Sequence, residues 1–225
     1  MKLIGIRLIC MAIGYLFGMI QTSYFVGQAK GIDIRQHGSG NAGTTNTLRV
    51  LGPKAGIFVM LVDIFKCIAA VWIVRLTFGP QYPEMEYLLY LYTGAGAILG
   101  HNYPFYLGFK GGKGIAATGG MILSFHLHFL IVGLIVFFGN FFITHLVSVG
   151  SLLVYVFFLT QMIIEGQMGV FNAPQAVLNE MYIVTFLLAA LAFWKHRQNI
   201  VRLIHGEERK TYLTKRIRWI KLWQK

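Results

Sequence analysis

Apolar residues gather in seven stretches separated by short polar segments, and this pattern predicts a bundle of membrane-spanning helices. A helix needs about 20 apolar residues to cross the hydrocarbon core of a bilayer. Boundaries inferred from sequence are accurate to a few residues. With that tolerance, we expect spans at residues 3–26, 54–78, 87–106, 112–128, 129–143, 146–165 and 176–194.

The fourth and fifth stretches have two interpretations, one long helix or two shorter ones. Glycines recur through residues 111–120, and His126 and His128 interrupt the apolar run before Gly139. Because such residues mark turns within apolar sequence, two helices joined by a turn are favoured. The chain is therefore expected to be an all-α integral membrane protein with about seven transmembrane helices.

The composition supports this class of protein. Of 225 residues, 56% are hydrophobic and 12% are charged, whereas soluble domains carry about 25% charged residues. Cys10 and Cys67 lie inside apolar stretches, which excludes an extracellular disulfide scaffold and gives a metal no ligand cluster. We expect no cofactor. No cleavage signal follows the first stretch, so residues 3–26 are interpreted as a retained helix.

Basic residues are unevenly distributed, and their distribution predicts the orientation in the membrane. The formal net charge is +12, and residues 195–225 hold ten basic and two acidic residues. The positive-inside rule places this end in the cytoplasm, and an odd number of spans then places the N-terminus outside. With this orientation, sixteen Lys and Arg residues fall on the cytoplasmic side and three on the outer side. Membrane topology therefore explains the charge without a nucleic-acid partner.

This distribution also divides the chain in two. Residues 1–208 are expected to form a single polytopic membrane domain, and residues 209–225 a basic cytoplasmic tail. Within the tail, residues 211–225 interleave basic with apolar and aromatic side chains. This composition is typical of a helix that lies on an anionic leaflet.

The first polar segment, residues 35–49, is rich in glycine, hydroxyl and amide side chains and ends in Arg49. It contains the spacing G-x-G-x-x-G, but it joins two membrane helices and lacks the strand and βαβ unit of a dinucleotide site. Glycines let backbone N–H groups approach an anion, and Arg49 offers a two-pronged donor to a phosphate. The segment therefore predicts an anion site, with a polar loop of helix-capping residues as the alternative.

The second polar segment, residues 100–114, ends in the sequence Gly-Gly-Lys-Gly. It is not a Walker A loop, because Leu107 stands where the first glycine is required and Gly114 replaces the Ser or Thr that binds magnesium. At a helix N-terminus, free backbone donors and the ammonium of Lys113 suit a phosphate or a developing oxyanion. The alternative is a flexible, positively charged anchor on the cytoplasmic side.

The third polar segment, residues 195–208, follows the last span. His196 and Asn199 are three residues apart and share a helical face. Alone, they would be read as interfacial residues, but the predicted topology places them on the same membrane face as the first two segments. Elsewhere, Asp63 and Lys66 form either a functional site within the membrane or a mutually neutralising pair.

These three segments resemble, in order, the three motifs of the bacterial acyl-phosphate:glycerol-3-phosphate acyltransferase family, PlsY. The matching residues are Gly38–Asn46 with Arg49, then His101 and Pro104 leading to Phe109–Gly114, then His196–Arg197, Asn199–Ile200 and Arg202–Leu203. The likeness covers residues 1–208. Departures are Thr44, where Ala is expected, Cys67, where Gly usually follows the Asp-x-x-Lys pattern, and the extension 211–225.

The resemblance implies an enzyme of the bacterial inner membrane that begins phospholipid synthesis, with its active site on the cytoplasmic face. It would transfer a fatty acyl group from acyl phosphate to the 1-hydroxyl of sn-glycerol 3-phosphate, giving lysophosphatidic acid and phosphate. Membrane lipid surrounds it, and no obligate protein partner is evident. The implied catalytic residues are Ser39, Arg49, Lys113 and His196, and the implied substrate-binding residues are Gly38, Gly40, Asn41, Gly43, Thr45, Asn46, His101, Gly111, Gly112, Gly114 and Asn199.

In this interpretation, Ser39, Arg49, Lys113 and Asn199 form the anion cradle, and His196 holds the glycerol hydroxyls. The proton of the attacking hydroxyl goes either to His196 or to the acceptor's own phosphate, and we favour the phosphate. The acyltransferase chemistry that pairs His with Asp five residues later is excluded, because Asp follows no histidine at that spacing. The remaining alternative, an anion or phospholipid transporter, is disfavoured because the charges cluster at one face instead of the midplane.

Overall fold

The computed structural model describes residues 2–212, and within them it contains helices and no β-strand. The long helices are α1 (Lys2–Gly18), α4 (Pro53–Thr77), α5 (Glu86–Asn102), α7 (Leu127–Thr144), α8 (Val147–Gln167) and α9 (Gln175–Lys195), and the short ones are α2 (Thr22–Gln28), α3 (Thr44–Leu51), α6 (Ile115–Leu123) and α10 (Arg197–Ile204). The expected all-α class is confirmed. Of the surface helix expected within residues 211–225, the part after Tyr212 lies outside the described residues.

Among residues 2–212, four helical segments are long and apolar enough to cross a membrane: Leu3–Gln28, Pro53–Gln81, Val147–Gln167 and Gln175–Lys195. The other three apolar stretches are also helical, as α5, α6 and α7. Between α6 and α7 the chain turns at Ser124–His126, where His126 has an extended backbone. The interpretation of this region as two helices is therefore confirmed.

The first apolar stretch differs from the single helix expected over residues 3–26. Its helix breaks after Gly18, and α2 starts at Thr22. Two carbonyl oxygens at the break accept bonds from distant side chains, that of Met19 from the Tyr106 hydroxyl (2.7 Å) and that of Ile20 from Lys66 Nζ (2.7 Å). These long-range bonds satisfy the backbone oxygens that the broken helix leaves free.

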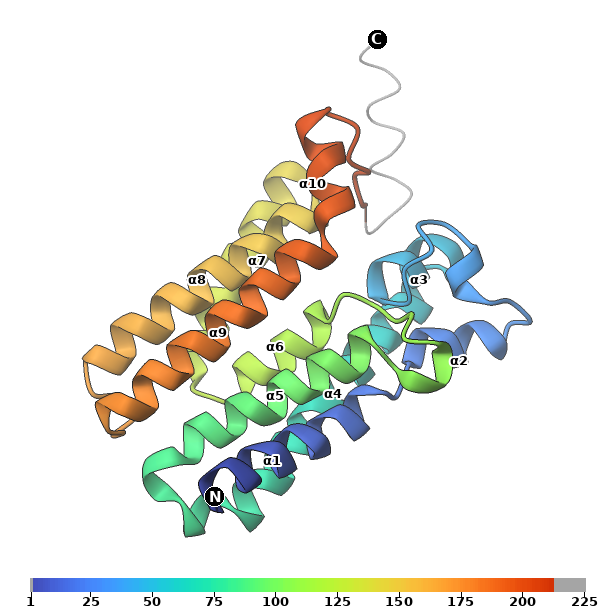
Figure 1. Cartoon of the computed structure of the whole chain (residues 1–225). Coiled ribbons are helices and arrows are strands. Elements are labelled where there is room, and N and C mark those ends of the chain that lie inside the picture. The colour runs from blue at the N-terminus through green and yellow to red at the C-terminus, as the bar shows by residue number, and fades with distance from the viewer. Residues whose placement is uncertain (1, 213–225) are drawn as a thin grey trace.

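The helices form two groups (Figure 1). One contains α1, α4, α5 and α6, and the other α7, α8 and α9, with contacts between α5 and α9 and between α6 and α7 joining them. Helices α2, α3 and α10 lie at one end of the bundle, and α1 begins at the other end.

Small residues allow α1 and α5 to pack closely. A Cβ atom at Gly14 or Gly18 of α1 would collide with the α5 backbone, and one at Gly96 or Gly100 would collide with that of α1. Small residues in this arrangement are typical of membrane helix pairs, whose backbones approach without intervening side chains. Because this pair is fixed in register, the C-terminal end of α5 has a defined position beside the break between α1 and α2.

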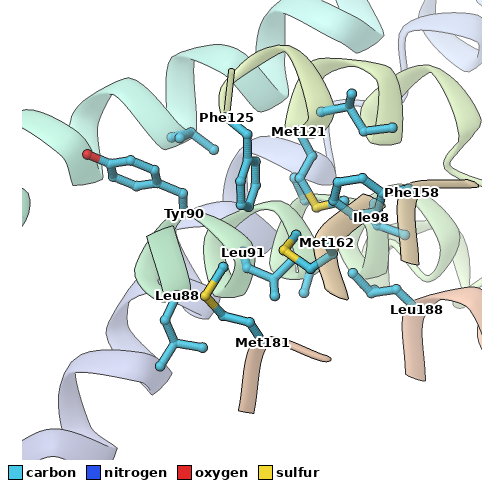
Figure 2. Close-up of a cluster of buried hydrophobic side chains, with 14 of the residues drawn as sticks. Leu88, Tyr90, Leu91, Ile98, Met121, Phe125, Phe158, Met162, Met181 and Leu188 are labelled. Atoms are coloured by element: carbon cyan, nitrogen blue, oxygen red, sulfur yellow. The ribbon is translucent and has the colours of Figure 1, made fainter. Parts of the chain in front are cut away.

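The core surrounds α5, most of whose side chains are buried. Figure 2 shows Leu88, Leu91 and Ile98 of α5 near Met162 of α8 and Met181 and Leu188 of α9, with Met121 and Phe125 on the α6 side. The flexible Met side chains fill the irregular space between the two helix groups. This packing holds the ends of α5, α6 and α9 together.

Candidate active site

A cavity of about 560 Å³ lies where α3, α6, α9 and α10 meet, and all three polar segments line it. The family-implied site residues that line it are Gly38, Ser39, Gly40, Asn41, Gly43, Thr45, Asn46 and Arg49 from the first segment, His101, Gly111, Lys113 and Gly114 from the second, and His196 and Asn199 from the third. These segments are far apart in sequence. The structure therefore brings together fourteen of the fifteen residues, all except Gly112.

Asn46 organises the first segment from inside. Its side-chain Nδ2 donates to the carbonyl oxygens of Ile34 (3.1 Å) and His37 (2.9 Å), and its Oδ1 accepts from the Ser39 amide (2.8 Å). Gly38 has a φ of +63° and packs on Asn46, so a side chain at this position would be both strained and obstructed. The Asn46 amide thus shapes the loop that carries Ser39.

The N-terminus of α3 also faces the cavity. Gly43 is its N-cap with an extended backbone, and Thr44 and Thr45, the first helical residues, line the cavity. Amides in the first turn of a helix have no intrahelical acceptor and carry partial positive charge. This end of α3 therefore favours an anion beside Ser39.

The second segment is bound to the end of α5. The amides of Gly111 and Gly112 donate to the carbonyl oxygens of Asn102 (3.2 Å) and His101 (3.0 Å). A Cβ atom at Gly112 would collide with the His101 ring and the Ala42 carbonyl. Gly112 therefore lies behind the cavity wall, where its missing side chain lets the two segments touch.

Lys113 lies in the loop before α6 and extends into the cavity, where its Nζ donates to Asn199 Oδ1. Burial lowers the pKa of this ammonium to about 8, and the positive charges of Arg202 and Arg49 act in the same direction. The opposing charge of Glu208 raises it in part. Lys113 is thus a desolvated cation placed among other cations, which is a favourable environment for a phosphate.

His196 stands between α9 and α10 and is buried. Its Nδ1 lies 2.8 Å from the Ala192 carbonyl oxygen, which only an Nδ1–H group can satisfy. Burial, and secondarily the charge of Lys113, lower the pKa of His196 to about 4. The ring is therefore neutral at pH 7, and its Nε2 is an unprotonated hydrogen-bond acceptor.

Two residues that sequence reasoning did not assign to the site take part in it. Glu208 accepts from Asn199 Nδ2 (2.6 Å), Arg202 Nε (2.7 Å) and Ser148 Oγ (3.0 Å). Burial raises the pKa of Glu208, but these hydrogen bonds outweigh it, so the pKa is lower than usual. A lone acidic pair within a basic segment, Glu207 and Glu208, was the available signal.

The second is Thr211, which is buried and binds Arg49. Arg49 Nη2 donates to Thr211 Oγ1 (2.7 Å) and to the Arg209 carbonyl oxygen (3.2 Å). The Thr211 amide donates to the His145 carbonyl oxygen (2.9 Å). Residues just beyond the expected domain boundary at 208 therefore contact the candidate site, while the boundary itself stays a prediction.

A buried polar cluster lies beneath the cavity. Lys66 Nζ is 2.8 Å from Asp63 Oδ1 and 3.0 Å from His101 Nδ1, and the Thr22 hydroxyl donates to the same Asp63 oxygen (3.0 Å). Asp63 and Lys66 therefore pair, which both interpretations from the sequence allow. Asp63 and His101 also line the cavity, so this buried cluster forms its floor.

Away from the cations, the cavity continues as an apolar groove between α4, α6, α7 and α8. Its walls include Met60, Ile64, Ile122, Leu134, Phe138 and Val154. Leu134 is 45% exposed and Phe138 is 38% exposed, so one side of the groove opens on the apolar surface of the bundle. A cationic end joined to an apolar groove fits an amphiphile that carries a phosphate.

Comparisons with known proteins agree with this geometry. The family model for glycerol-3-phosphate acyltransferase matches residues 8–206. The chain is 40% identical to the glycerol-3-phosphate acyltransferase of Halalkalibacterium halodurans, over 87% of this chain and 91% of the relative. It is 44% identical to that of Shouchella clausii, over 88% of this chain and 92% of the relative.

Solved structures of PlsY, an integral membrane glycerol 3-phosphate acyltransferase, are also similar. Its glycerol 3-phosphate form has a TM-score of 0.79 and 30% identity, covering 92% of this chain and 96% of that chain. Its lysophosphatidic acid form has a TM-score of 0.76 and 29% identity, with the same coverage. The family model, the relatives and the shared fold together establish that the chain belongs to the glycerol-3-phosphate acyltransferase family of integral membrane proteins, PlsY.

Proposed function

We propose that the protein transfers a fatty acyl group from acyl phosphate to the 1-hydroxyl of sn-glycerol 3-phosphate, giving lysophosphatidic acid and inorganic phosphate. The observation that carries the proposal is the junction of a cationic cavity with an apolar groove, lined by all three polar segments. Both substrates carry phosphate, and only the donor carries a long apolar chain. The names of the relatives support glycerol 3-phosphate as the acceptor.

The anion cradle would consist of Ser39, Arg49, Lys113 and Asn199, together with the first amides of α3. Arg49 would exchange its longer Nη2 bond, to the Arg209 carbonyl oxygen (3.2 Å), for a phosphate bound through two parallel N–H groups, whereas Lys113 offers a desolvated charge. The acyl chain would lie in the groove and place its carbonyl carbon at the boundary between the two regions. Positioning and charge stabilisation then supply the acceleration, since acyl phosphate is already an activated donor.

In the transfer step, the 1-hydroxyl oxygen of the acceptor bonds to the acyl carbonyl carbon. The bond between that carbon and the phosphate oxygen breaks, and inorganic phosphate leaves with the electron pair. His196, with a pKa of about 4, is a weak base at neutral pH, so its Nε2 accepts a hydrogen bond from the glycerol and orients it. The hydroxyl proton passes to the acceptor's phosphate, whose second pKa near 6 suits this role better.

The proposed membrane arrangement has seven spans, with the N-terminus outside and the candidate active site on the cytoplasmic face of the bacterial inner membrane. The sixteen-to-three distribution of basic residues supports it. A cysteine at Gln36 should be protected from an impermeant reagent in intact cells, and one at Gln81 should react, since both residues are exposed on the protein. The native Cys10 and Cys67 are buried and give little background. If only the cysteine at Gln36 is labelled, the protein has the opposite orientation, with residues 27–53 outside.

A donor competition assay tests the reaction. Purified protein in detergent is given labelled glycerol 3-phosphate with acyl phosphate, acyl-CoA or acyl-carrier protein in parallel reactions. We expect labelled lysophosphatidic acid from acyl phosphate alone. Product formed only from acyl-CoA or only from acyl-carrier protein would identify that compound as the donor and contradict acyl phosphate. No product from any donor, in protein that remains folded, would favour the phospholipid or anion transporter.

A further inference from the structure

The groove has a defined far end. Ile122 of α6, Gly133 of α7 and Val154 of α8 line the groove and also a second space beyond it, which is too small to hold a water molecule. Phe129 and Phe158 line that second space and are almost completely buried. The groove therefore ends against packed aromatic rings about one helical turn beyond Gly133, where Leu130 is its last lining residue on α7.

Gly133 differs from the glycines that serve helix packing. A Cβ atom at Gly14 or Gly96 would collide with a neighbouring backbone, whereas one at Gly133 would have no protein atom within 4 Å. Gly133 therefore brings no two helices together. Its missing side chain leaves open space near the end of the groove instead.

We propose that Gly133 determines the length of the acyl chain that the groove accepts, an inference that rests on the proposed function. From Gly114, beside Lys113, to Ile122 the chain advances eight residues, or about 12 Å of helical rise. An extended hydrocarbon advances about 1.25 Å per carbon–carbon bond. About ten carbons thus reach the level of Ile122 and Gly133. Longer chains must use the space that a side chain at Gly133 would fill.

The test compares Gly133→Leu with Gly139→Leu on the same helix. Gly139 also has open space around a Cβ atom, but it does not line the groove. We measure kcat/KM for decanoyl and hexadecanoyl phosphate in detergent, with saturating glycerol 3-phosphate. Gly133→Leu should lower the ratio of kcat/KM for hexadecanoyl phosphate to kcat/KM for decanoyl phosphate at least about tenfold, the scale of overpacking one apolar side chain. Gly139→Leu should leave the ratio unchanged.

Gly133→Ala provides a smaller perturbation should the leucine variant fold poorly, and we expect an intermediate ratio. An unchanged ratio in folded Gly133→Leu, or an equal change in Gly139→Leu, would overturn the proposal. The wild-type reaction keeps this result separate from the proposed function. If wild-type protein uses acyl phosphate while the ratio stays fixed, only the role of Gly133 fails. If wild-type protein makes no product from acyl phosphate, the proposed donor fails.

Discussion

The pKa of Lys113 predicts how activity should depend on pH. Its ammonium has a pKa of about 8, lowered mainly by burial. In the proposed reaction the charged form binds phosphate, and this form is lost as the pH rises through its pKa. About nine tenths of Lys113 is charged at pH 7 and about one tenth at pH 9. The kcat/KM for acyl phosphate should therefore fall about tenfold between pH 7 and pH 9.

Bound substrate should shift this dependence. A phosphate beside Lys113 adds an opposite charge, which favours the ammonium and raises its pKa. Because kcat reports the substrate complex and kcat/KM reports free protein, the decline in kcat should begin at a higher pH than the decline in kcat/KM. Formation of labelled lysophosphatidic acid is the suitable readout, since phosphate release also records spontaneous donor hydrolysis.

The control is Lys113→Arg, which remains charged above pH 12. Its absolute activity should be lower, because a guanidinium does not match the position of an ammonium, but its kcat/KM should stay level from pH 7 to pH 9. A level profile for wild-type protein would refute the reasoning. So would the same decline in Lys113→Arg, since the titrating group would then lie elsewhere.

Four further predictions separate the roles of the site residues. Lys113→Ala should lower kcat by about two to three orders of magnitude. Lys110→Ala should change kcat little, because Lys110 is exposed and its side chain has no hydrogen-bond partner among residues 2–212. If both variants lose equally little activity, the loop is only a charged anchor. Arg49→Lys should lower kcat/KM at least about tenfold, because one of two parallel phosphate bonds is lost; wild-type kinetics would contradict two-pronged binding. Thr211→Val removes the hydroxyl that accepts from Arg49 Nη2 and should lower kcat/KM about fivefold, the scale of one hydrogen bond. Thr211→Ser keeps the hydroxyl and should restore kcat/KM. Equal kcat/KM values for both variants would argue against a role of Thr211 in positioning Arg49. His196→Ala should raise the KM for glycerol 3-phosphate more than it lowers kcat, and a change confined to kcat would identify His196 as the base instead.

The meeting of the three polar segments was predictable from their order along the chain. Apolar helices alternate in direction, so the segments before α3, before α6 and after α9 arrive at the same end of the bundle. The residue types in each segment then predicted an anion site. Which residues of a segment face the cavity could not be predicted. Gly111 and Gly112 are equivalent in sequence, although only Gly111 lines the cavity.

Features that depend on long-range contacts escaped prediction. The break between α1 and α2 is accompanied by bonds from Lys66 and Tyr106, which lie far along the chain. Glu208 and Thr211 reach the site because the chain turns back after α10, with Gly206 at a φ of +71°. Sequence patterns record helix faces and lengths, but they do not record which loop another loop will touch.

The contacts of residues 207–212 also bear on the order in which the protein is assembled. Ribosomes deliver helices α1 to α6 to the membrane well before they deliver these residues. Arg49, in α3, can therefore be in an inserted, partly folded bundle before its partner Thr211 has been synthesised. A nascent chain can thus occupy the membrane before the contacts of the candidate site are complete. Proteolytic loss of residues 207–212 would likewise leave Arg49 without Thr211 and Asn199 without Glu208 in a bundle that is already inserted.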